Sequence, residues 1–127
     1  MTVGVSTVNT ADVWLNYLRG TAPGAIASLN IKLHTADPGA SGATAASAVT
    51  TRQVLTFSAS ASGALALSNS PTFTMTATET ISHISVWSDV AAGNFLFSAA
   101  LTVPKSVVNT DTLTFTAVAV SITPLAA

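Results

Sequence analysis

The sequence predicts an all-β protein, an antiparallel β-sandwich of the jelly-roll or Ig-like kind with one short N-terminal helix. Apolar and polar residues alternate in several short segments, as they do in strands that have one buried face. Turn-forming Gly, Pro, Asn and Asp residues separate these segments. One segment near the N-terminus has apolar residues at helical spacing instead. Short strands with turns between them are typical of a sandwich or a barrel.

The chain has 127 residues, a length at which one domain is expected. Residues 1–9 show no periodic pattern and are expected to form an extended arm. The single β-sandwich domain is expected over 10–127, and it begins with a helix over 10–19. Thr10 is the predicted N-cap of this helix, and Gly20 lies where a left-handed C-terminal residue belongs.

The predicted helix has one apolar stripe, at the i, i+3, i+4, i+7 spacing of a helical face. Its members are Ala11, Trp14, Leu15 and Leu18. A helix of about three turns does not persist alone in water, so its stability must come from packing. Trp14 and Leu18 are therefore expected to dock on another surface.

The strands are predicted in segments that alternate or that are apolar almost throughout. In 29–34, Leu29, Ile31 and Leu33 alternate with polar residues, which predicts one buried face and one wet face. Segment 95–101 is nearly continuously apolar and is expected to be a central strand covered on both faces. The full set of predicted strands is 29–34, 52–57, 63–67, 72–78, 83–87, 95–101 and 112–122.

The connections carry further information. Residues 40–51 are rich in Ala, Ser, Gly and Thr and are predicted to be a long loop, a length that is uncommon unless the loop makes a contact. Pro104 places its segment at a sheet edge or a bend. After residue 117 the alternation gives way to an apolar run, where a β-bulge would switch the faces. Pro124 is expected to end the last strand.

The composition indicates a surface that other subunits cover. Only 7% of the residues are charged, against about 25% in an ordinary soluble domain, while 49% are hydrophobic. Few Lys or Glu residues are present to guard the sheet edges, and unguarded edges tend to pair with another chain. We therefore expect a symmetric homo-oligomer or a packed shell rather than an isolated monomer.

The same counts exclude several classes of function. Four basic side chains are too few to neutralise a run of phosphates, so nucleic-acid binding is not expected. No window approaches the length of a membrane-spanning helix, so no membrane insertion is expected. The chain has no Cys, and it has no G-x-S-x-G, H-E-x-x-H or phosphate-binding motif. No enzyme activity, cofactor or metal is predicted, and Glu79 is expected to be a solvated loop charge.

Four further residues are candidates for contacts. His34 lies in the polar phase of its strand and is expected at the surface or as the anchor of a loop. Asp37 and Arg52 flank the long loop and are candidates to pair across it. Trp87 shares its phase with polar residues, so either a helix or loop covers it or it anchors an interface. With Trp14 and Leu18, these residues form the predicted assembly surface.

A resemblance to a known family adds to this interpretation. The run Leu-His-Thr-Ala-Asp-Pro-Gly at 33–39 resembles a motif of small tail-fibre-like or minor tail proteins of tailed phages that infect actinobacteria. Segments 52–57, 81–87, 93–96 and 101–105 resemble later blocks of the same family, in the same order. The family suggests no catalytic residues.

The resemblance implies a non-enzymatic exterior subunit of a phage virion, assembled in the host cytoplasm and packed against copies of itself and other virion proteins. A capsid decoration protein that stabilises the shell is the first alternative. A module that binds host-surface carbohydrate through the loop 35–51 and Trp87 is the second.

Overall fold

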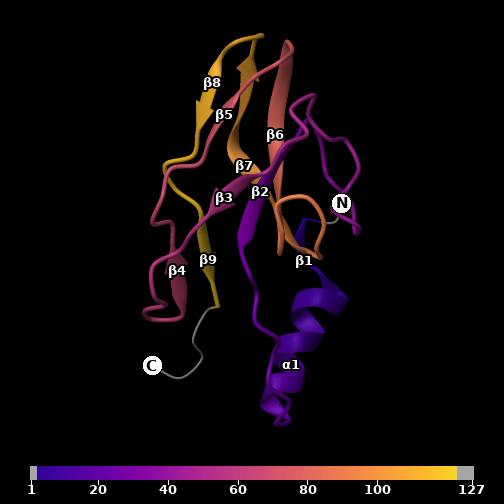
Figure 1. Cartoon of the computed structure of the whole chain (residues 1–127), viewed down its shortest axis with the longest axis vertical. Coiled ribbons are helices and arrows are strands. Elements are labelled where there is room, and N and C mark those ends of the chain that lie inside the picture. Colours follow the sequence, from indigo (N-terminus) through magenta and orange to yellow (C-terminus); the bar gives the residue numbers. More distant parts are fainter. Residues whose placement is uncertain (1–2, 123–127) are drawn as a thin grey trace.

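The computed structural model describes residues 3–122 and shows an antiparallel β-sandwich with one short helix near the N-terminus (Figure 1). The predicted fold class is therefore confirmed. In chain order the elements are β1 (Gly4–Val5), the π-helical turn η1 (Thr7–Ala11), α1 (Asp12–Leu18), β2 (Leu29–His34), β3 (Gln53–Leu55), β4 (Ala64–Ala66), β5 (Thr72–Thr74), β6 (Glu79–Trp87), β7 (Phe95–Val107), β8 (Thr112–Thr114) and β9 (Ala119–Ser121).

The main sheet has the strand order β1-β7-β6-β2-β3, and each neighbouring pair is antiparallel. β6 lies in the middle of this order and β7 is the interior strand beside it, so the prediction that 95–101 belongs to a central strand is confirmed. Beyond β7 lies only β1, which pairs with Phe97 and Ser98. Phe95 and Leu96, neighbours whose side chains alternate across the strand, are nevertheless both buried. The apolar run therefore reflects burial on both faces of this strand, although only the short β1 lies beyond it in the sheet.

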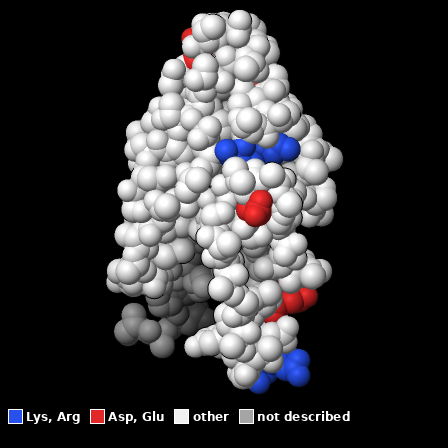
Figure 2. Space-filling model, in the orientation of Figure 1, with Lys and Arg blue, Asp and Glu red and all other residues white. Residues whose placement is uncertain are grey.

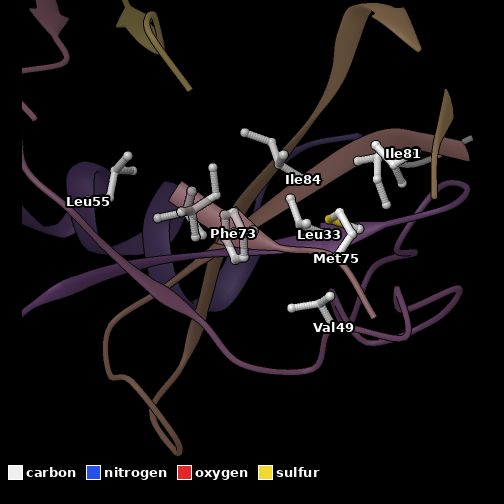
Figure 3. Close-up of a cluster of buried hydrophobic side chains, with 10 residues drawn as sticks. Leu33, Val49, Leu55, Phe73, Met75, Ile81 and Ile84 are labelled. Atoms are coloured by element: carbon white, nitrogen blue, oxygen red, sulfur yellow. The ribbon is translucent and has the colours of Figure 1, made fainter. Parts of the chain in front are cut away.

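Two small sheets, β5-β8 and β4-β9, form the second layer of the sandwich. Phe73 and Met75 of the β5 segment enter the core opposite side chains from β2, β3 and β6 (Figure 3). The rings of Phe73 and Phe115 meet edge to face, with centroids 6.2 Å apart. The buried apolar cluster consists of Ile31, Leu33, Val49, Leu55, Phe73, Met75, Ile81, Ile84, Val86 and Val107.

Strands β5 and β8 carry a threonine-rich outer face. Thr72 and Thr74 are exposed on either side of the buried Phe73. Thr72 lies opposite Thr114, and the two hydroxyl oxygens are 3.0 Å apart. This part of the surface is uncharged and carries β-branched residues that suit a pleated sheet.

The wet face predicted for 29–34 is wrong. Asn30 and His34, both in the polar phase, are completely buried. The predicted loop 40–51 folds back over this end of β2, where Ser47 N donates to the Leu33 carbonyl and Ala46 forms a bridge with His34. His34 is covered because the loop is held there, which strand periodicity alone does not reveal.

The N-terminal region also differs from the prediction. The chain becomes helical at Thr7, inside the arm expected over 1–9, because the Ser6 hydroxyl accepts a hydrogen bond from Asn9 N at 3.3 Å and caps the turn. Thr10, the predicted cap, is buried and donates its hydroxyl to the Leu96 carbonyl at 2.7 Å. Gly20 has a φ of 90°, as predicted for the residue that ends the helix.

In the C-terminal half the bend predicted at Pro104 is confirmed, whereas a break over 115–118 stands where a β-bulge was predicted. The register between β6 and β7 shifts between Ile81, opposite Lys105, and His83, opposite Ala100, so Pro104 lies in a bulged part of β7. The predicted final strand is divided, since β8 pairs with β5 whereas β9 pairs with β4. Pro124 lies outside the described residues.

Candidate assembly interface

The helix α1 buries none of its residues. Trp14 is 43% exposed, Leu15 62% and Leu18 79%. Within residues 3–122 Trp14 is covered over about half of its surface and Leu18 over little of it, so the docking expected for these two residues stays a prediction. A helix of about two turns is unstable alone, so its apolar face indicates a surface that another molecule covers.

Other exposed apolar side chains surround these residues. We call the whole group the α1 surface, and it consists of Val8, Trp14, Leu15, Tyr17, Leu18 and Ile26, each at least 43% exposed. Figure 1 shows that α1 projects from one end of the sandwich. Charged side chains are few and scattered on the face shown in Figure 2.

An open groove of about 790 Å³ runs beside α1, between the helix and the end of the sandwich. Val13 and Trp14 of the helix line one wall together with Ile26 of the following segment. The opposite wall contains core-type side chains, among them Leu29, Phe57, Leu65, Phe97 and Val120. The groove extends the apolar character of the α1 surface toward the core.

A second group of candidate residues forms a buried hydrogen-bonded chain. The His34 side chain has no exposed area. Its Nδ1 lies 2.8 Å from the Thr44 carbonyl oxygen, and its Nε2 lies 2.7 Å from the Ser85 hydroxyl. A carbonyl only accepts, so Nδ1 carries the proton and the neutral ring accepts from Ser85 at Nε2. The Ser85 oxygen in turn accepts the Trp87 indole N–H at 2.8 Å.

Arg52 covers the indole at the other end of this chain. Its guanidinium carbon lies 4.1 Å from the centre of the Trp87 ring, a cation–π geometry. Its Nη1 donates to the carbonyl of Asp89 at 2.7 Å and also to that of Ala92. The Phe95 ring packs at 5.7 Å from the Trp87 ring. Trp87 is thus half-buried by its own chain, as one of the two sequence interpretations expected.

Burial also shifts the pKa values in this region. Desolvation lowers the pKa of His34, which outweighs the opposing effect of the hydrogen bond to Thr44. The pKa of Lys32 is lowered mainly by burial and then by the nearby charge of Arg52. Backbone N–H groups of Ala91 and Ala92 donate to the Asp89 carboxylate and lower its pKa.

The long loop is anchored at both ends by carboxylates. Asp37 Oδ1 accepts from Gly39 N at 2.9 Å in an Asx-type turn, and Gly39 has a φ of 72°. Glu79 contacts the Ser47 hydroxyl and accepts from Ala48 N at 3.2 Å. The expectation that Glu79 is a solvated loop charge is therefore wrong, because it holds the loop to the start of β6. Pairing of Asp37 with Arg52 stays a prediction.

The structure therefore separates the six predicted residues into distinct places. Trp14 and Leu18 belong to the exposed α1 surface, whereas His34, Arg52 and Trp87 form one cluster under the loop. Sequence reasoning missed Ser85, which joins His34 to Trp87. The position of Ser85 could have indicated this role. Ser85 and Trp87 share a face of β6, and the hydrophobic alternation of β6 and β2 sets the register in which the two strands pair.

Two further findings concern metal binding and membrane crossing in the described region. Among residues 3–122, no three His, Cys, Asp or Glu side chains lie close enough together to hold a metal ion. No helix in the same part of the chain is long and apolar enough to cross a bilayer.

The fold and the site are those of a structural protein, a charge-poor β-sandwich with an exposed apolar helix face. Comparison with known protein families matches residues 4–123 to the family described as Podophage GP4 fiber I protein gp80. The chain belongs to this family and is a tail-fibre-like structural protein of a phage virion, where it contacts other virion proteins. No curated protein matches the chain. The phage assignment is confirmed, whereas the actinobacterial host stays a prediction.

Proposed function

We propose that the chain is an exterior accessory subunit of a phage tail, assembled in the host cytoplasm, that attaches to its neighbours through the α1 surface and acts without catalysis. Membership of a phage fibre family supports the location. The mode of action is inferred from the exposure of Trp14, Leu15 and Leu18 on a helix in which no residue is fully buried.

The physical reason is the cost of leaving such a helix in water. Fully burying a Leu side chain is worth about 1.5–3 kcal/mol, and Leu18 is still 79% exposed. A partner that covers α1 recovers most of this free energy and stabilises the helix at the same time. Neighbouring subunits in a virion provide such a partner at high local concentration.

The test replaces Leu15 and Leu18 by Asp in phage particles. Both side chains are exposed, so the isolated subunit should keep its unfolding free energy to within about 1 kcal/mol. The variant should nevertheless be missing from purified particles, as judged by gel densitometry. A matched control introduces two Asp residues at Thr74 and Thr116, which are exposed on the sandwich. Normal incorporation of the double Leu variant would refute the proposed attachment.

Copy number separates the tail role from decoration of the capsid. A tail subunit should be present in few copies per particle, whereas a decoration protein should approach the copy number of the major shell protein. Carbohydrate binding through Trp87 receives less support, because Arg52 already occupies one face of the indole. A glycan that stacks on that face would have to displace the guanidinium.

A further inference from the structure

The two charged residues of the helical segment lie along one side of its apolar stripe. Between residues 7 and 28 only Asp12 and Arg19 are charged, and both are exposed. They are seven residues apart, so they lie within about 20° of each other around the helix axis. Leu15 and Leu18 lie on the adjoining face. The two charges therefore flank the same side of the apolar stripe, one at each end of α1.

This arrangement matches one way of pairing two identical helices. When helices pack antiparallel, the same flank of each helix meets, and the N-terminal end of one lies beside the C-terminal end of the other. Asp12 of one copy would then lie beside Arg19 of the second, and the reverse contact would form at the other end. In a parallel pair opposite flanks meet, so the Asp12 and Arg19 side chains of the two copies would lie on opposite sides of the seam and would not pair.

We propose that α1 of one copy packs antiparallel against α1 of a second copy, as a two-fold interface in which Leu15 lies near the axis. The proposal rests on the proposed function, since it names the partner that covers the α1 surface. The interface is isologous, meaning that the same patch is used by both subunits and that the contact closes without forming fibres.

A second copy fits better than an unrelated virion protein because it already carries the complementary pair of charges. An unrelated partner would need an apolar face with opposite charges at matching separation. Helices of about two turns form a smaller contact than a standard interface of about 800 Å² per partner. We therefore expect weak association of the isolated subunit, with a Kd on the order of 10–100 µM.

Charge exchange tests the pairing by sedimentation equilibrium of the full chain at low ionic strength. Asp12→Arg alone and Arg19→Asp alone set like charges together, and each should raise the Kd at least about tenfold. The double variant Asp12→Arg/Arg19→Asp should restore dimers. An equal mixture of the two single variants should also dimerise, because one copy then carries two positive charges and the other two negative. Equal behaviour of all five samples, the unchanged chain included, would overturn the proposal.

A cysteine provides an independent readout, since the chain has none of its own. Leu15→Cys should form disulfide-linked dimers under mild oxidation, because residue 15 lies near the two-fold axis. Thr116→Cys is the matched control, as it is exposed on the sandwich and away from α1. If Leu15→Cys links no faster than the control, the proposed pairing is wrong. If the double Asp variant of Leu15 and Leu18 is still absent from particles in that case, the proposed function stands and a different partner covers α1.

Discussion

Replacing Ser85 by Ala should destabilise the fold far more than loss of one hydroxyl group suggests. The hydroxyl donates to His34 Nε2 at 2.7 Å and accepts from the Trp87 indole at 2.8 Å. His34 has no exposed area, so its Nε2 would lose its partner without access to water, which costs about 1–3 kcal/mol. Trp87 is half-exposed and can bind water instead, so its loss should be about 1 kcal/mol or less.

The sum predicts a decrease of about 1–4 kcal/mol in the free energy of unfolding, a large part of the 5–15 kcal/mol typical of a domain. Urea denaturation followed by circular dichroism measures this difference, and the melting temperature should fall by roughly 10 °C. Ser106→Ala is the control, because its hydroxyl contacts that of Thr80 at 3.3 Å on the exposed surface. A loss below about 0.5 kcal/mol for Ser85→Ala would show that the buried chain does not stabilise the fold in this way.

Three other predictions follow from the same region. Burial lowers the pKa of His34, so this histidine binds a proton more readily in the unfolded chain than in the folded one. The free energy of unfolding should therefore be constant above about pH 6.5 and fall below it, as a pH series of urea denaturation measures. In His34→Gln this part of the pH dependence should disappear. Gly42→Ala should cost at least about 2 kcal/mol, since φ is 69° and the added Cβ would lie 2.2 Å from the Phe95 ring; Gly24→Ala, where nothing lies within 4 Å, should change the melting temperature little. Arg52→Ala should uncover the indole beneath it and raise its accessibility to acrylamide quenching, with no change expected in Ser106→Ala.

Local patterns in the sequence predicted most of the strands because their cause is local. The alternation in 72–78 places Phe73 and Met75 in the core and the threonines outside, as the structure shows. The loop 40–51 and the bend at Pro104 were likewise predictable. Small residues, and a proline that lacks the backbone N–H, affect the backbone at their own positions. The position of the helix start was not, because Ser6 and Thr10 can both cap a helix, and in the structure Ser6 caps it while Thr10 bonds to the Leu96 carbonyl.

The candidate site was less predictable, for a different physical reason. His34 has the phase of a surface residue, and only the loop that folds over β2 makes it a core residue. Its partner Ser85 is far away in the sequence and carries no motif. By contrast, the apolar stripe of α1 could be predicted from its spacing in the sequence, as could the need of so short a helix for a packing surface.

The most direct test of the account is a cryo-electron microscopy map of the intact particle in which this chain is located. The account predicts that Trp14, Leu15 and Leu18 lie against protein density at the tail, with most of their side-chain area covered. A map in which α1 points into solvent, while the chain is held to the particle through another face, would contradict it.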